Sequence, residues 1–162
     1  LHLSIRRQRQ MCIRDSKNDL FNTVLARDGI QPYPGSRRWV DRLHESGMAM
    51  AVVSSSRNAA AVLKAAGMVE DFSVLVDGNR SKTERLPGKP APDTYLRGAE
   101  LLGVPAEQCV VVEDAVSGVR AGAAGGFGMV LGVNRGVGAD RLREAGADRV
   151  VDDLDEMVEE MA

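Results

Sequence analysis

Two adjacent carboxylates, Glu113 and Asp114, directly follow the apolar run Val110-Val111-Val112. A buried strand that ends in two carboxylates carries a large desolvation cost unless something compensates their charge. A hard divalent cation is the usual compensation, because Mg²⁺ prefers carboxylate, water and phosphate oxygens. The alternative is structural, with Asp114 as the N-cap of a helix that begins at Val116. The position at a strand end favours the metal site and leaves capping open.

A second polar group, Ser54-Ser55-Ser56-Arg57-Asn58, lies between an apolar run and a helical pattern. Hydroxyls, an amide and backbone N–H groups at a helix N-terminus form an anion site. The guanidinium of Arg57 adds a planar fork that suits phosphate. An ordinary capped turn between a strand and a helix also selects Ser and Asn. From the residues alone, both interpretations stay open.

The third group is the loop Gly88-Lys89-Pro90-Ala91-Pro92-Asp93. A lysine between glycine and proline, with a second proline behind it, has a rigid backbone and few directions in which to point. This suits a fixed ammonium beside a phosphate or a carboxylate. The alternative is a solvated loop lysine, which the flanking prolines make less attractive.

The elements that must position these groups alternate between helix and strand. Helical spacing and stop signals predict helices at 20–25, 39–43, 62–66, 93–102, 116–124, 139–145 and 154–161. Short apolar runs predict strands at 48–53, 72–76, 109–112, 127–133 and 149–151, and the polar stretch 77–91 predicts a loop. This alternation is typical of an α/β fold, a Rossmann-like parallel sheet with helices on both faces. Ligands bind beyond the carboxyl ends of such strands, so we expect Ser54, Lys89 and Asp114 to converge there.

Length and composition bound the class of protein. The 162 residues are 44% hydrophobic and 27% charged, which indicates one globular domain. No apolar run approaches the ~18 residues of a membrane span, and the net charge of −2 gives no case for nucleic acid or membranes as partners. The two cysteines, Cys12 and Cys109, indicate a reducing compartment, and we expect a cytoplasmic protein.

The first sixteen residues, LHLSIRRQRQMCIRDS, differ in composition from the rest of the chain. They lack its glycine, alanine and valine and carry four arginines against one aspartate. A secretory signal would need an apolar core, which the segment lacks. A basic nucleic-acid arm is one interpretation. The other is non-native sequence, because RQRQMCIRDS resembles the translation of a sequencing adapter. We favour the second and expect no function from residues 1–16.

The three polar groups, in this order and spacing, resemble the motifs of the haloacid dehalogenase superfamily. Ser54 after its strand resembles the second motif, Lys89 in GKPAPD the third, and Glu113-Asp114 in VVVEDAVSGVRAG the fourth. The resemblance extends from Lys17 to the C-terminus. Lys17-Asn18-Asp19, Pro32-Tyr33-Pro34-Gly35 and the Ser54–Asn58 group are most similar to the β-phosphoglucomutase-like branch.

The resemblance implies phosphoryl transfer through an aspartyl-phosphate, with Mg²⁺ as cofactor and a small phosphorylated substrate, in particular a sugar phosphate. Ser54 would then hydrogen-bond the phosphoryl oxygens, Lys89 would neutralise their charge, and Asp114 with Glu113 would bind the metal. The implied substrate-binding positions are Ser55, Ser56, Arg57, Asn58 and, from the cap domain, Lys17. The family also implies a monomer for the full-length enzyme.

One motif of the family is missing. Its first motif, DxD after an apolar strand, supplies the nucleophile, and no such pattern occurs here. Asp15 lies in the atypical segment, Asp19 lies in a helical pattern, and Asp153-Leu154-Asp155 lies at the wrong end of the chain. We therefore interpret residues 17–29 as a cap remnant and 30–162 as a core without its first strand, inactive by itself.

Two structural expectations follow from this interpretation. The missing strand would lie between the strands that end at Ser54 and Glu113, so both would face an open edge. Leu1-His2-Leu3-Ser4-Ile5 has enough strand propensity to occupy the gap.

Two other functions compete with phosphoryl transfer. One is a non-catalytic phosphate-binding module that keeps Ser54, Lys89 and Asp114. The other is a receiver-like signalling domain, for which no acceptor aspartate is found.

Overall fold

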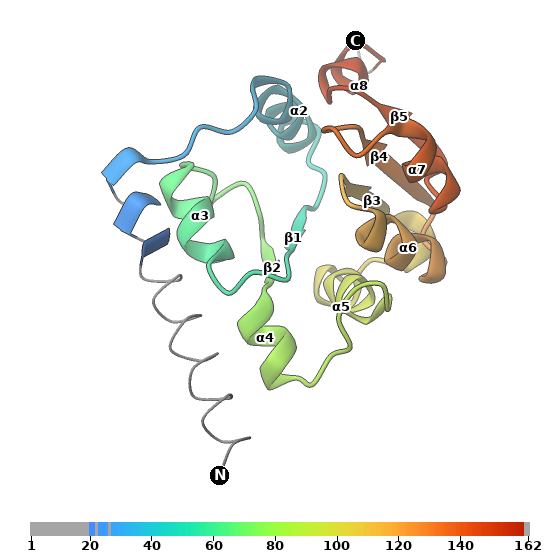
Figure 1. Cartoon of the computed structure of the whole chain (residues 1–162), viewed down its shortest axis with the longest axis horizontal. Helices are drawn as coiled ribbons and strands as arrows, with labels where there is room; N and C mark the ends of the chain where they lie inside the picture. The colour runs from blue at the N-terminus through green and yellow to red at the C-terminus, as the bar shows by residue number, and fades with distance from the viewer. Residues whose placement is uncertain (1–19, 22, 26, 161–162) are drawn as a thin grey trace, which may run out of the picture.

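The computed structural model describes residues 20–21, 23–25 and 27–160 (Figure 1). The strand predicted over residues 1–5, the segment 1–16 and Lys17 lie outside the described residues. Residues 20–28 are helical wherever they are described, as their apolar spacing predicted. No helix in the described ranges is long and apolar enough to cross a membrane.

The described strands form two parallel sheets, which confirms the α/β prediction. In one, β1 (Ala51–Val53) pairs with β2 (Val74–Val76); in the other, β4 (Met129–Val133) lies between β3 (Val110–Glu113) and β5 (Arg149–Val151). Val53 is paired with Val76, and Glu113 with Gly132, so the carboxyl ends of neighbouring strands lie level. This alignment brings the turns that follow the strands to a common edge.

Helices connect the strands and cover them. They are α2 (Pro34–Glu45), α3 (Ala59–Ala65), α4 (Gly78–Thr83), α5 (Asp93–Leu102), the short 3₁₀ turn η1 (Ala106–Gln108), α6 (Val116–Ala124), α7 (Ala139–Glu144) and α8 (Asp155–Glu160). Helix α5 packs on β1 and β2, whereas α6 packs on β3 and β4, and α7 on β4 and β5. Helix α2 contacts α8 (Figure 1).

The prediction of a continuous loop over 77–91 is wrong, because α4 forms within it. Helix α4 begins at the nearly buried carboxylate of Asp77, which accepts hydrogen bonds from the backbone N–H groups of Asn79 (3.0 Å) and Arg80 (2.8 Å). An N-cap of this kind satisfies two of the donors that a helix start leaves unpaired. Polar composition suggested a loop, and the capping aspartate overrides it.

The core is built from small aliphatic side chains. Val119, Leu131 and Leu142 are fully buried around the β3–β4–β5 sheet. Close packing of α6 on this sheet requires Gly122, where a Cβ atom would lie 3.0 Å from Val130 and 3.1 Å from Val111. A separate cluster, Val40, Met50 and Met68, packs beside β1.

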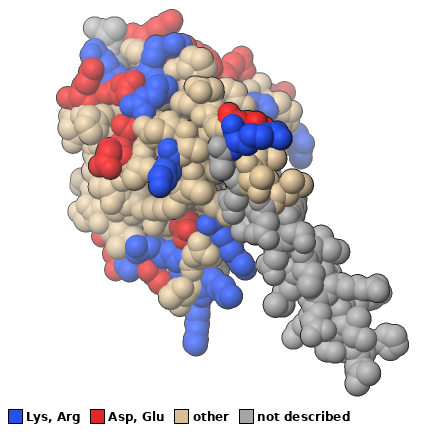
Figure 2. Space-filling view, turned by 90° about the vertical axis from the view of Figure 1, so that its left-hand side faces the viewer, with Lys and Arg blue, Asp and Glu red and all other residues tan. Residues whose placement is uncertain are grey.

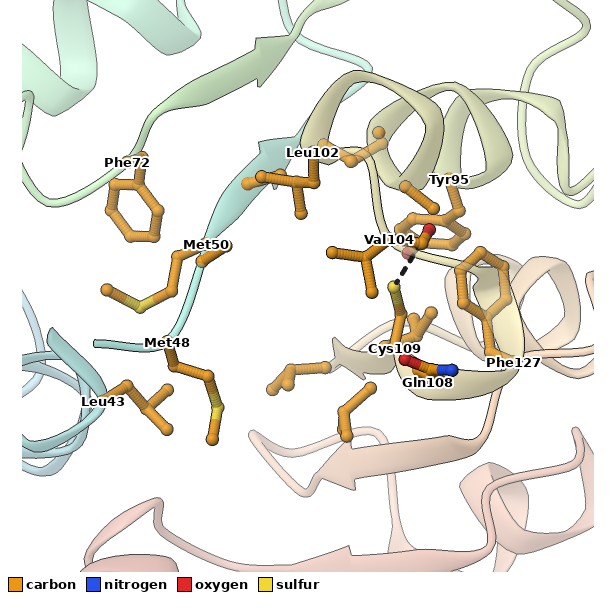
Figure 3. Close-up of a pocket in the computed structure, with 18 of the residues that line it drawn as sticks. Leu43, Met48, Met50, Phe72, Tyr95, Leu102, Val104, Gln108, Cys109 and Phe127 are labelled. Atoms are coloured by element: carbon orange, nitrogen blue, oxygen red, sulfur yellow. Dashed lines mark hydrogen bonds between the residues drawn. The ribbon is translucent and has the colours of Figure 1, made fainter. Parts of the chain in front are cut away.

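An apolar cleft separates the two sheets. Among the described residues β1 pairs only with β2, and β3 only with β4, so the edges that face each other are open. The cleft has a volume of about 460 Å³ and is lined from both sides (Figure 3). Its labelled lining residues in that view are Leu43, Met48, Met50, Phe72, Tyr95, Leu102, Val104, Gln108, Cys109 and Phe127.

Candidate active site

Lys89 and Glu113 form an ion pair at the carboxyl edge of the strands. The Lys89 ammonium contacts Glu113 Oε1, and it lies 3.4 Å from the backbone carbonyl oxygen of Val53. Both side chains are only 12% exposed. Because Val53 ends β1 and Glu113 ends β3, the ammonium bridges the strand ends on the two sides of the cleft.

The carboxylate of Glu113 has further partners on both oxygens. The Tyr95 hydroxyl donates a hydrogen bond to Oε1 at 2.5 Å, and the backbone N–H of Ala115 donates to Oε2 at 3.2 Å. The Tyr95 ring also lies beneath the ammonium, with 4.5 Å from Lys89 Nζ to its centroid. Burial, and then the charge of Glu113, raise the pKa of the Tyr95 phenol far above its ordinary value. The phenol therefore stays protonated and acts as a donor.

Asp114 is exposed, and it does not cap the helix that follows. The N-cap position of α6 is Ala115, without a side-chain capping bond, and it is Glu113 that contacts the Ala115 N–H. The structural alternative for Asp114 is therefore not what the structure shows. Its carboxylate lies at the surface directly beyond the strand end, where a solvated ligand can reach it.

The turn after β1 is ordered by its own hydroxyls. The Ser54 N–H donates to the Val76 carbonyl (2.9 Å), the Ser54 hydroxyl oxygen accepts from the Ser56 N–H (3.1 Å), and the Ser56 hydroxyl oxygen accepts from the Asn58 N–H (3.1 Å). Local bonds of this kind are what a capped turn needs. Each hydroxyl accepts in these bonds, and a hydroxyl that accepts can still donate its proton to an anion.

The turn is also held from the side. The Asn79 side-chain amide donates to the Arg57 carbonyl (3.0 Å), and the Gly78 N–H donates to the Ser56 carbonyl (3.0 Å). A Cβ atom at Gly78 would lie 2.6 Å from the Ser55 carbonyl oxygen, so the approach of the two segments requires glycine there. Ser55, Ser56 and Arg57 themselves are exposed.

The structure thus brings Lys89 and Glu113 into contact at the edge where the sequence expected them. Ser54 and Asp114 are the residues that follow Val53 and Glu113, the two contacts of the ammonium. The convergence of their side-chain tips stays a prediction. Sequence reasoning missed Tyr95, although its place six residues after Lys89, on the first turn of a helix, was the available signal.

The donor set can be compared with what a hard cation requires. Glu113 and Asp114 supply oxygen ligands at a strand end, which is the chemistry that Mg²⁺ prefers. No cluster of three or more His, Cys, Asp or Glu side chains able to hold a metal occurs in the described part of the chain. The pair fits a cation that completes its shell with water and phosphate oxygens. Figure 2 shows basic and acidic side chains side by side on the face it presents.

The chain is similar in sequence to known proteins. The family model of haloacid dehalogenase-like hydrolases matches residues 5–126. A β-phosphoglucomutase of Mycobacterium bovis is 46% identical over 145 residues, covering 88% of this chain and 55% of the relative. Hexitol phosphatase A of Escherichia coli is 39% identical over 132 residues, covering 80% of this chain and 57% of the relative. The chain thus spans little more than half the length of these curated relatives.

The fold of the chain is also similar to solved structures. The crystal structure of CbbY from Rhodobacter sphaeroides, in complex with phosphate, superposes with a TM-score of 0.77 at 26% identity. The match covers 91% of this chain and 65% of that one. The family model covers most of the chain, and the first relative is a β-phosphoglucomutase. The chain belongs to the haloacid dehalogenase-like hydrolase family, in its β-phosphoglucomutase-like branch.

Proposed function

We propose that this chain is the phosphate- and metal-binding part of a Mg²⁺-dependent enzyme that transfers a phosphoryl group of a small phosphorylated substrate, a sugar phosphate. The observation that carries the proposal is the Lys89 ammonium, held between the ends of β1 and β3 by Val53 and Glu113. Phosphoryl transfer needs positioned positive charge more than covalent machinery, and a nearly buried ammonium supplies it. The names of the relatives, a phosphoglucomutase and a hexitol phosphatase, support the substrate class.

The proposed roles follow from position. Lys89 neutralises the phosphoryl oxygens, and the Ser54 hydroxyl donates to them from the end of β1. The turn Ser55-Ser56-Arg57-Asn58, exposed at its first three residues, binds the rest of the substrate, as does Lys17, which lies outside the described residues. The aspartate that forms the aspartyl-phosphate is not among these roles, because no residue of this chain matches it.

The metal would be held by Asp114, the more accessible carboxylate, together with Glu113. Mg²⁺ held by these carboxylates would supply positive charge that stabilises the phosphoryl oxygens. Lys89, Tyr95 and Ala115 already occupy the oxygens of Glu113, so we expect weak Mg²⁺ binding that depends on Asp114. Calorimetry that shows tight binding would contradict this assignment.

Calorimetric titration of the full chain with inorganic phosphate, in the presence of Mg²⁺, tests the site. Lys89→Ala and Ser54→Ala should each weaken phosphate binding, Lys89→Ala by at least about tenfold, or about 1.4 kcal/mol. Lys64→Ala, which removes an exposed lysine of α3, is the matched control and should bind as the unchanged chain does. Thermal unfolding of each variant shows whether it folds. An unchanged chain that binds no phosphate would overturn the proposal.

The second candidate, a non-catalytic phosphate-binding module, predicts the same binding result. The two candidates differ in one respect. A non-catalytic module would not hydrolyse phosphate esters even when this chain is joined to the part of a longer relative that it does not cover.

A further inference from the structure

Tyr95 contacts both members of the ion pair from a third element, α5. Its hydroxyl lies 2.5 Å from Glu113 Oε1, and its ring centroid lies 4.5 Å from Lys89 Nζ. One side chain therefore offers a hydrogen-bond donor to the carboxylate and a π face to the ammonium. Hydrogen bonds to ionised groups and cation–π contacts are both strongest where water is excluded.

The Tyr95 ring is itself fixed in place. It is 7% exposed, and it meets Phe127 edge to face, with 6.0 Å between the ring centroids and 80° between the planes. Helix α5, which carries it, packs on β1 and β2. Burial and the contact with Phe127 therefore restrict where the phenol oxygen can lie.

The carboxylate that receives the hydroxyl is also confined. Its other oxygen accepts from the Ala115 N–H, and a Cβ atom at Gly118 would overlap Glu113 Cδ. The carboxyl group is thus pressed against the α6 backbone where only a glycine leaves room. With Tyr95 on one oxygen and Ala115 on the other, both of its oxygens are held.

We propose that Tyr95 is a positioning residue for phosphate binding: its hydroxyl fixes Glu113, and Glu113 fixes the Lys89 ammonium at the carboxyl edge of the strands. The inference rests on the proposed function for the ligand, and on the geometry above for the mechanism. A lysine ammonium is a point charge on a flexible stem, so its location depends on its partners. Loss of the hydroxyl leaves Glu113 with one donor fewer and lets the ammonium move away from the phosphate.

The test is Tyr95→Phe in the full chain, because this change removes only the hydroxyl and keeps the ring. The chain has two tyrosines, so Tyr33→Phe is the matched control: Tyr33 is exposed and its ring stacks on Arg135 instead. Three quantities are measured for each: the dissociation constant of inorganic phosphate by calorimetry, the thermal unfolding midpoint, and the side-chain ammonium NMR signal of Lys89. Lys89→Arg, which removes that signal, assigns it.

We expect Tyr95→Phe to weaken phosphate binding about three- to tenfold, in the range of one charge-assisted hydrogen bond, and to broaden the Lys89 ammonium signal. Tyr33→Phe should change neither. A lower unfolding midpoint with unchanged phosphate affinity and an unchanged signal would mean that Tyr95 is merely structural, and would overturn the inference. If the unchanged chain binds no phosphate, the proposed function fails, and the Lys89 signal alone decides the role of Tyr95.

Discussion

Glu113 is nearly buried, with a side chain that is only 12% exposed. Lys89 and Tyr95 meet one oxygen, the Ala115 N–H meets the other, and Gly118 lies against the carboxyl carbon. A buried carboxylate costs free energy unless it is both paired and hydrogen-bonded, and here it is both. The sequence assigned this residue to the metal alone; the structure shows that it also anchors the ammonium.

Gly118→Ala should therefore act on the site and not on the helix alone. Alanine is ordinarily better than glycine inside a helix by about 1 kcal/mol. Here the added methyl group would occupy the place of the Glu113 carboxylate, and overpacking of this kind typically costs about 1–3 kcal/mol. We expect a lower unfolding midpoint and weaker phosphate binding, measured by calorimetry.

Ser117→Ala is the control for this change, because it alters the neighbouring exposed position of α6 and touches no part of the carboxylate. It should leave phosphate affinity unchanged. A Gly118→Ala chain that is more stable than the unchanged chain, with normal phosphate binding, would show that Glu113 moves aside without cost and that its enclosure has no function.

The residues of the site could be predicted to different degrees. Lys89 was recognisable because two prolines and a glycine restrict it, and Glu113 because it ends an apolar run. Tyr95 was not, since a tyrosine on an amphipathic helix is ordinarily a core residue. Its role depends on Glu113, at the end of β3, lying within hydrogen-bond distance of Tyr95, and local sequence patterns do not contain this tertiary contact.

At the scale of elements, the predicted limits agree with the structure to different degrees: 149–151 is β5 as predicted, whereas the helix predicted at 39–43 extends over Pro34–Glu45. The predicted ranges 93–102 and 116–124 agree with α5 and α6 to the residue. The runs predicted as strands at 48–53 and 72–76 are paired only over Ala51–Val53 and Val74–Val76. Strand length is set by the neighbouring strand as well as by the run itself, so an apolar run without a second partner forms a shorter ladder.

The cleft in Figure 3 lies between β1 and β3, whose facing edges are unpaired among the described residues. Trp39 lines this cleft, and its indole Nε1 is buried without a hydrogen-bond partner in the described part of the chain. Buried donors are nearly always paired in folded proteins. In the described part of the chain, this unpaired donor and the two open strand edges are what we expect where no strand lies between β1 and β3. Exposed edges of this kind favour association between molecules.

Val110→Lys tests this view of the edge. Val110 is the first residue of β3, lines the cleft and is 53% exposed, so a lysine there can reach solvent without disturbing the core. A charge on an open edge opposes edge-to-edge pairing, so we expect slower aggregation in light-scattering measurements with little change in the unfolding midpoint. Val69→Lys is the control, because Val69 is 47% exposed and lies outside the cleft lining. Equal slowing by both variants would attribute the effect to net charge and not to the edge.

At the scale of the whole molecule, the chain covers 55% of the Mycobacterium bovis relative, and its sheets meet across an apolar cleft. We proposed phosphate-binding roles for Ser54 and Lys89, and the sequence has no DxD motif after an apolar strand to supply the nucleophile. We therefore expect the 162-residue chain to bind phosphate but to release none from a phosphate ester such as p-nitrophenyl phosphate. Nucleophilic catalysis fails when its nucleophile is absent, even if the binding groups remain.

A chimera adds the part of a longer relative that this chain does not cover. The part of the Mycobacterium bovis relative that this chain does not cover is joined to residues 17–162; the two proteins are 46% identical over the 145 residues that they share. We expect the chimera to unfold cooperatively at a higher temperature than the chain alone, because a strand in the cleft pairs both open edges. It should also turn over phosphate esters in the presence of Mg²⁺.

The same chimera with Lys89→Ala separates the gain in stability from the gain in turnover, since it should keep the stability and lose the turnover. Stability without turnover in the unaltered chimera would favour the non-catalytic module, and neither gain would show that the cleft is not the place of a missing strand.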